Sequence, residues 1–274
     1  MSTEFTIEPG KCWWCGADAD SREHRLKASD LRREYGKPPY NDLRTLTRFS
    51  GGDRHDFRGT NSNLVKFSKT LCTRCNDTRS QPLDSAWDRF TACLADHEVD
   101  VVDAAKLDWS EVFGTDWRAA GADLERYVLK HAICRMIDQL PGPIIIGGEF
   151  IDFLNGGRRP ALHIELKIDL GVLAMLRGTR EAPPPEQPEA AEAGFLGTLD
   201  LNVGSIPDTE QWTAPSSGIV YRYVVVLWQL GVKGRSPLQR RRVRLGTTDA
   251  MFGRDFRTAI EAYERTNRSD AGRS

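Results

Sequence analysis

Two C-x2-C pairs constrain the fold of this chain more than any other feature of its sequence. Cys12 and Cys15 form the first pair, Cys72 and Cys75 form the second, and residues 16–71 lie between them. Four thiolates arranged in two such pairs can complete the tetrahedral shell of a zinc ion. The sequence therefore predicts a structural zinc ion that joins two distant segments. A redox role for Cys12 and Cys15 is the weaker alternative, because the strand-to-helix context of redox pairs is not expected there.

The composition places the chain among globular proteins. It has 274 residues, of which 39% are hydrophobic and 28% charged, and its net charge is −1. The composition excludes collagen, coiled coils and wholesale disorder. The longest apolar region, around residues 223–228, is too short to cross a membrane, and the N-terminus lacks the pattern of a signal peptide. We therefore expect a cytoplasmic protein that does not span a membrane.

The near-neutral net charge hides an uneven distribution. Lys and Arg outnumber Asp and Glu between residues 21 and 80, whereas acidic residues dominate residues 81–131. A uniformly basic nucleic-acid binder is therefore not expected, but a basic face on the N-terminal part is.

The pattern of the sequence divides the chain into three parts. These are an N-terminal zinc-containing module over residues 8–96, a helical connector over residues 97–140, and a C-terminal domain over residues 141–268. The length of the chain allows more than one core.

Hydrophobic periodicity predicts the main elements. Apolar stripes indicate a helix that starts at Pro82 and a second helix over residues 123–139, with loop and a short helix over residues 99–121. Strict alternation over residues 162–169 indicates a half-buried strand. The remaining expected elements are a short helix over 147–155, a loop over 181–193, strands over 195–203, 219–230 and 238–245, and a final helix over 255–266. The fold class is therefore α+β, with an antiparallel sheet and flanking helices in the C-terminal domain.

The segment between the cysteine pairs carries the residues that point to chemistry. Glu23 and His24 follow the first cysteine pair, and Asn76 directly follows the second pair. Asn61 and Asn63 lie between His24 and the second cysteine pair. A neutral histidine can take a proton from water near neutral pH. Carboxylate and amide oxygens are ligands for a hard divalent ion. One histidine beside one such ion is a minimal apparatus for phosphodiester hydrolysis.

This combination of motifs resembles the HNH, or ββα-metal, nuclease family. The resemblance covers residues 10–90 and rests on the two cysteine pairs, the Glu23–His24 step, a middle asparagine and Asn76. It implies a zinc-stapled ββα-metal module with His24 as the general base. It also implies that Glu23 and Asn76 hold a catalytic Mg²⁺ or Mn²⁺.

The middle asparagine of the family ties down the loop that orients the catalytic histidine. Asn63 precedes Leu64 and so resembles the family's Asn-Leu step, but it lies farther from Cys72 than is usual. Asn61 and Asn63 therefore remain alternatives for this role. The chain also departs from the family in having Glu23 where aspartate is commoner, and in the long stretch after His24.

Basic residues near these motifs are the candidates for nucleic-acid contacts: Arg22, Arg25, Lys27, Arg74 and Arg79. Charged runs are usually solvated faces, but beside a candidate nuclease centre the steering of phosphates is the better interpretation. The arginine-rich run at residues 240–244 is either a second phosphate contact or a strand with exposed arginines.

The sequence thus predicts a metal-dependent endonuclease that hydrolyses DNA, and the family resemblance implies 3′-hydroxyl and 5′-phosphate products. A monomer with one site would nick, so paired cuts need a homodimer or two encounters. Two alternatives remain. One is a non-catalytic zinc module that binds nucleic acid. The other is a zinc-stapled scaffold whose acidic segment, residues 84–125, meets protein partners.

Overall fold

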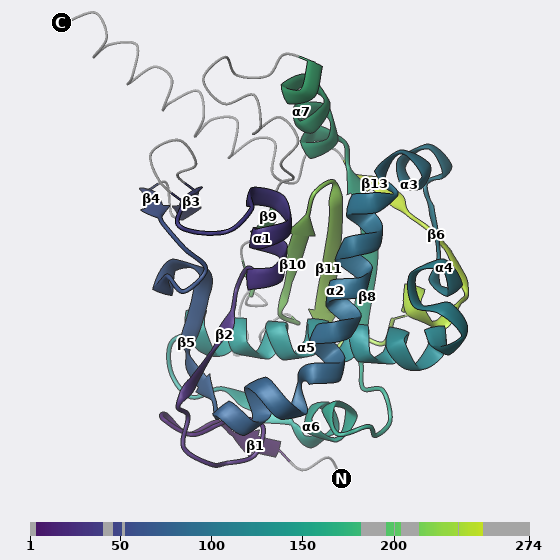
Figure 1. Ribbon diagram of the computed structural model, residues 1–274. Coiled ribbons are helices and arrows are strands. Elements are labelled where there is room, and N and C mark those ends of the chain that lie inside the picture. Colours follow the sequence, from purple (N-terminus) through teal and green to yellow (C-terminus); the bar gives the residue numbers. More distant parts are fainter. Residues whose placement is uncertain are drawn as a thin grey trace, which may run out of the picture.

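The computed structural model describes residues 4–40, 46–50, 53–181, 196–199, 201–203, 214–234 and 236–248. Within them the chain is a mixed α+β protein (Figure 1). Its strands are β1 (Glu4–Thr6), β2 (Ser21–His24), β3 (Leu46–Ser50), β4 (Asp53–Phe57), β5 (Lys66–Leu71), β6 (Lys106–Asp108), β7 (Ile145–Gly147), β8 (Leu162–Asp169), β9 (Leu196–Thr198), β10 (Ser216–Tyr221), β11 (Val224–Leu230), β12 (Arg242–Arg244) and β13 (Gly246–Thr248).

The α-helices are α1 (Ala28–Tyr35), α2 (Gln81–Asp96), α3 (Glu98–Ala104), α4 (Trp109–Phe113), α5 (Trp117–Gln139), α6 (Gly148–Leu154) and α7 (Leu170–Glu181). Short helical turns of other types are η1 (Asn63–Val65), η2 (Arg74–Arg79), η3 (Gly114–Asp116) and η5 (Pro237–Gln239). No helix among the described residues has both the length and the apolar character needed to cross a membrane.

The residues that carry the candidate motifs form two antiparallel strands followed by a helix. Strand β2 pairs with β5, and the π-helical turn η2 leads from the end of β5 into α2. The hairpin of β3 and β4 lies between β2 and β5 in the sequence. This ββα arrangement brings the two ends of the long segment between the cysteine pairs to one place.

A five-stranded sheet with the order β13-β8-β11-β10-β9 forms the C-terminal part. Its strands are antiparallel except that β13 runs parallel to β8. Strand β8 has the predicted alternation, because Leu162, Ile164 and Leu166 are buried while the residues between them are partly exposed. Strands β10 and β11 are almost continuously buried, as expected of strands covered on both faces.

Helix α5 connects the two halves of the molecule. It packs against α2, α4 and β5, and in Figure 1 it runs across the view near the lower ends of β10 and β11. Its buried residues include three charged ones, Glu125, Lys130 and Arg135. Most of the buried apolar residues between Cys12 and Leu245 form one cluster, so the three predicted parts of the chain share a core. A second, smaller cluster consists of Leu31, Tyr40, Phe57 and Val65. The division of the chain into separate domains stays a prediction.

The structure confirms several predicted elements and corrects others. The helix predicted from Pro82 begins at Gln81, and β8 has the predicted bounds. Helix α5 begins at Trp117, earlier than predicted, because Trp117 is itself buried in the core. The segment before α5, predicted as loop with a short helix, forms α3, β6 and α4. Helix α4 is capped by the side chain of Asp108, which accepts a hydrogen bond from the backbone N–H of Ser110.

The prediction of one strand over residues 219–230 is wrong. The chain turns at Arg222 and Tyr223, so that β10 and β11 form a hairpin. Arg222 has φ of 51°, which residues other than glycine rarely adopt, and no Asn-Gly signal marks the turn. The strand predicted over 238–245 is reduced to β12, after η5. The final helix predicted over 255–266 lies outside the described residues, as does the loop predicted over 181–193, apart from the last residue of α7.

Candidate metal centre and active site

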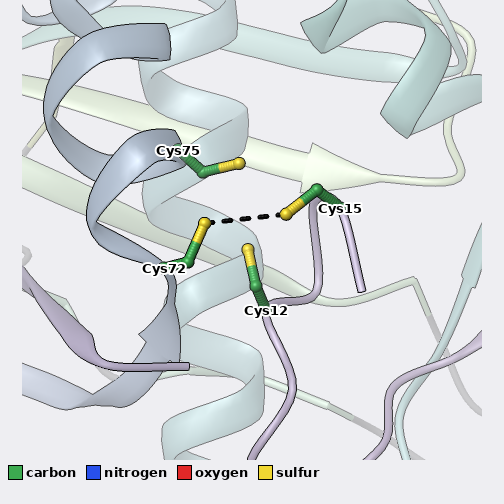
Figure 2. A group of neighbouring side chains, drawn as sticks. All are labelled: Cys12, Cys15, Cys72 and Cys75. Atoms are coloured by element: carbon green, nitrogen blue, oxygen red, sulfur yellow. Dashed lines mark hydrogen bonds between the residues drawn. The ribbon is translucent and has the colours of Figure 1, made fainter. Parts of the chain in front are cut away.

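The four predicted metal ligands come together beside the ββα unit. Figure 2 shows the side chains of Cys12 and Cys15 from a loop facing those of Cys72 and Cys75 at the start of η2. Their Sγ atoms lie within 4.8 Å of one another, and the Cys15 and Cys72 Sγ atoms are 3.6 Å apart. Zinc–sulfur bonds of about 2.3 Å in a tetrahedron place sulfurs about 3.8 Å apart. The cluster could therefore hold a structural metal ion such as zinc.

The chain around the cysteines is built to present the thiols. The backbone N–H of Gly16 donates to the carbonyl of Cys12 at 2.8 Å, and the turn ends with Gly16 at φ of 77°. Burial raises the pKa of the Cys12 thiol and of the Cys75 thiol, so these sulfurs do not ionise readily on their own. A bound divalent ion reverses this effect, because it stabilises the thiolate directly.

The two tryptophans of the first cysteine pair pack beside the cluster. Trp13 and Trp14 are buried, and their rings stack with centroids 5.8 Å apart. The indole N–H of Trp14 donates to Oδ1 of Asn155 at 2.9 Å, which ties the cysteine loop to the end of α6. Both side chains therefore serve the packing of this region.

His24 ends strand β2 and is held by the loop before η1. Its Nε2 lies 3.3 Å from the carbonyl oxygen of Thr60. Because a carbonyl only accepts hydrogen bonds, Nε2 must carry the hydrogen, which leaves Nδ1 as the basic nitrogen. Burial and the nearby charge of Lys66 lower the pKa of His24 to about 4. The imidazole is therefore neutral at pH 7.

Glu23 directly precedes His24 on β2, where the pairing with β5 is irregular between Arg22 and His24. Its side chain is buried, and Oε2 lies 2.8 Å from Nζ of Lys130, which has 0% side-chain exposure. The same ammonium lies 3.2 Å from Oδ1 of Asp84 on α2. Burial raises the pKa of Glu23, against the opposing effect of Lys130. The structure thus places Glu23 in a buried ion-pair network.

Asn76 packs against the same strand from η2. Its Nδ2 donates to Oγ of Ser21 at 3.0 Å and to the carbonyl of Arg22 at 3.3 Å. Its Oδ1 is buried and accepts no hydrogen bond within the described part of the chain. Asn76 therefore lies beside the backbone that precedes Glu23 and keeps one oxygen without a protein partner.

The two candidate middle asparagines make different contacts. Oδ1 of Asn63 accepts a hydrogen bond from Nη1 of Arg22 at 3.0 Å, which joins the loop to the strand that bears His24. Oδ1 of Asn61 accepts from Nζ of Lys66 at 3.3 Å, on β5. Asn63 is thus the one that contacts the histidine strand, while the carbonyl of Thr60 contacts the imidazole.

The predicted phosphate contacts fall into two groups. Arg25 is engaged internally, because Nη2 pairs with Asp138 and the guanidinium lies 4.6 Å from the ring centre of Phe67. Lys27 is also engaged, with Nζ 3.0 Å from Oδ2 of Asp88.

Three further predicted contacts are closer to solvent. Arg74 and Arg79 are exposed on η2, and Arg22 is half-buried on β2. Arg79 also lies against the metal cluster, since its guanidinium is 5.0 Å from the ring centre of Trp14. Of the five predicted contacts, the two exposed ones therefore lie on η2.

The arginine-rich run at residues 240–244 lies on another edge of the molecule. Strand β12 pairs with β6, and Nε atoms of Arg241 and Arg242 lie 3.2 and 2.9 Å from the carboxylate of Asp108. Arg244 lies directly opposite Lys106 in the register. These residues are exposed, so the strand has the outward-facing arginines that one of the two interpretations requires.

Sequence reasoning missed three residues that contact the candidate site residues or their partners: Lys130, Asp84 and Thr60. Lys130 is a lysine among apolar neighbours of α5, and Asp84 lies in the first turn of α2, eight residues after Asn76. An unexplained lysine in an apolar stripe was the available signal for the first. Thr60 acts through its backbone, and nothing in its side chain could have indicated that.

Comparisons with known proteins yield no relative: no family model matches the chain, and neither a curated protein nor a solved structure is significantly similar to it.

Proposed function

We propose that this chain is a metal-dependent endonuclease that hydrolyses phosphodiester bonds of DNA. The observation that carries the proposal is the setting of His24. Its Nε2–H is directed at the carbonyl of Thr60, and no described residue is a hydrogen-bond partner of Nδ1. The residue lies on a strand pair joined to a helix, beside four clustered thiols. An imidazole fixed through one nitrogen and open at the other is suited to act as a base.

The donor sets fit the two metal ions that the proposal needs. The four thiols suit zinc, which would fix the loop before β2 against the start of η2. Oδ1 of Asn76 is a buried oxygen without a hydrogen-bond partner among the described residues, and Oε2 of Glu23 pairs with Lys130. Glu23 and Asn76 would hold Mg²⁺ or Mn²⁺. When bound, such an ion would stabilise the negative charge that develops at phosphorus.

His24 would take the proton of the attacking water at Nδ1. Burial keeps this imidazole neutral at pH 7, since it lowers the pKa to about 4. A phosphate group beside the ring would raise the pKa again, because a nearby negative charge favours the protonated form. The base would thus become stronger when substrate is bound.

The exposed arginines of η2 would position the nucleic acid. Arg74 and Arg79 lie on the turn that also carries Asn76 and Cys75. Cations in this position can pair with phosphates that flank the scissile bond.

Cleavage of supercoiled plasmid by the zinc-loaded protein tests the proposal. We expect nicking with Mg²⁺ or Mn²⁺, none with EDTA, and none with His24→Ala. His97→Ala is the matched control, because this side chain is 61% exposed and its partner among the described residues is the nearby Asp100. Salt-sensitive DNA binding without cleavage would instead support a non-catalytic nucleic-acid module. Absence of both binding and cleavage would support the protein scaffold.

A further inference from the structure

Lys130 is a lysine whose whole side chain is enclosed by the protein. Its exposure is 0%, and it belongs to the apolar middle of α5. A buried ammonium is costly unless anions surround it. Two carboxylates do so here, with Oε2 of Glu23 at 2.8 Å and Oδ1 of Asp84 at 3.2 Å. One carboxylate on β2 and one on α2 thus share the ammonium of Lys130.

The rest of the network connects this cation to the candidate metal ligands. Oγ of Ser80 lies within hydrogen-bond distance of Oδ2 of Asp84, at 2.7 Å, and of the backbone carbonyl of Asn76, so its one hydrogen is shared between these two acceptors. Asn76, Ser80 and Asp84 follow one another at four-residue intervals along η2 and α2, so they lie on one helical face. The ammonium therefore lies between β2, which carries Glu23, and α2, whose Asp84 is connected to Asn76 through Ser80.

We propose that the ammonium of Lys130 is a built-in counter-cation that limits how tightly Glu23 binds a divalent ion. The inference rests on the proposed function, in which Glu23 is a ligand of that ion. In the metal-free protein the ammonium of Lys130 pairs with Glu23 and with Asp84, and it fixes Oε2 of Glu23. With a divalent ion present, the ammonium and the ion repel each other across the same carboxylate, which weakens binding.

Weaker binding of the divalent ion by Glu23 would favour catalysis. A nuclease metal must bind and yet leave coordination positions to water and phosphate. Two carboxylates without the ammonium would form a stronger and more closed cation site. Lys130 is therefore a positioning residue that acts through Glu23, and it touches neither substrate nor the reacting atoms.

Titration of the zinc-loaded full chain with Mn²⁺ tests the inference, with calorimetry as the readout. We expect Lys130→Met to bind Mn²⁺ at least about tenfold more tightly than wild type, because the repulsion is gone and Asp84 is released. Lys130→Arg keeps the charge and should stay within about threefold of wild type. Lys27→Met removes a cation that contacts Asp84 but not Glu23, and its effect should be smaller.

A second comparison covers the case in which Lys130→Met does not fold, since that variant leaves two carboxylates without a cation. In Asp84→Asn the ammonium is left to Glu23 alone, and Mn²⁺ should bind more weakly than in wild type. Adding Lys130→Met to Asp84→Asn leaves only one carboxylate and should restore binding above that of Asp84→Asn. Glu23→Gln should abolish the gain in each background.

The outcomes separate this inference from the proposed function. Tighter Mn²⁺ binding on removal of Lys130, lost with Glu23→Gln, supports the inference even if the wild type cleaves no DNA. Equal or weaker binding in the folded Lys130 variants overturns it, even if the wild type is an active nuclease. Absence of Mn²⁺ binding in every variant also overturns it.

Discussion

His131 is a titratable residue enclosed in the core, and it makes stability depend on pH. Its Nε2 lies 3.2 Å from the carbonyl of Arg25, its Nδ1 has no partner among the described residues, and its ring meets Phe67 edge to face at 5.0 Å. Burial, with the charge of Arg135, lowers the pKa of His131 to about 3. In the unfolded chain His131 therefore binds a proton with a pKa near 6.5, whereas in the folded protein the same imidazole stays neutral down to about pH 3.

The sign of this linkage follows from the lowered pKa. Between about pH 6.5 and pH 3 the unfolded state carries the extra proton, so stability is lost as pH falls through this range. His131 alone should make the protein about 2 kcal/mol less stable at pH 5 than at pH 7. His131→Gln keeps a donor toward Arg25 but does not titrate, so urea unfolding at the two pH values should show a smaller difference. An unchanged difference would contradict this assignment.

At the scale of elements, the cysteine cluster joins the loop of Cys12 and Cys15 to the start of η2. A metal ion bound by all four thiols would fix these two segments against each other. Cys72→Ser should lower the zinc content, and we expect a loss of at least about 3 kcal/mol, or about 6–12 °C in Tm. Cys93→Ser is the matched control, since Cys93 is a partly buried thiol of α2 outside the cluster. Elemental analysis and thermal unfolding measure both. Full zinc content in Cys72→Ser would exclude the cluster as the metal site.

The β10–β11 turn is held by charges rather than by a turn sequence. Arg222 pairs with Glu34 at 3.0 Å and with Glu98 at 2.9 Å, and all three side chains are largely buried. Arg222→Ala should cost about 3–5 kcal/mol, because it removes a cation that pairs with two buried carboxylates. Arg222→Gly also loses the pairs but relieves the positive φ, so it should be about 1 kcal/mol less harmful. Urea unfolding measures both, and a loss below about 1 kcal/mol in Arg222→Ala would refute this role.

Prediction from sequence succeeded where one local signal decides the outcome. The alternation of β8, the start of α2 after Pro82 and the meeting of two C-x2-C pairs are of this kind. It failed where distant residues decide. The turn at Arg222 depends on Glu34 of α1, and the surroundings of Glu23 depend on Lys130 of α5. Neither pairing leaves a periodic or composition signal in the sequence.

At the scale of the whole molecule, the predicted phosphate contacts divide into exposed cations and internally paired ones. Arg74 is exposed beside the candidate site, whereas Arg25 and Lys27 are paired internally. If DNA contacts the candidate site, Arg74→Gln should lower the slope of log affinity against log salt by about one. Fluorescence anisotropy with a labelled duplex measures the slope. An unchanged slope would remove Arg74 from the interface.

The same experiment decides the role of the arginine-rich strand β12. Arg244→Gln removes an exposed cation from the two-stranded sheet of β12 and β6, where Arg244 lies opposite Lys106. A slope equal to that of wild type shows that the run is a solvated strand with exposed arginines. A reduced slope shows that DNA also reaches β12 and therefore spans the molecule.

The most direct test of the central claim is the single-turnover rate of cleavage of an end-labelled DNA duplex, with Mn²⁺, by wild type and by His24→Ala. The account predicts that the variant is slower by about 10²–10⁴-fold, the usual contribution of a positioned base. Zinc content and thermal stability should be close to those of wild type. Equal rates, or a wild type that cleaves nothing while its zinc site is full, would contradict the account.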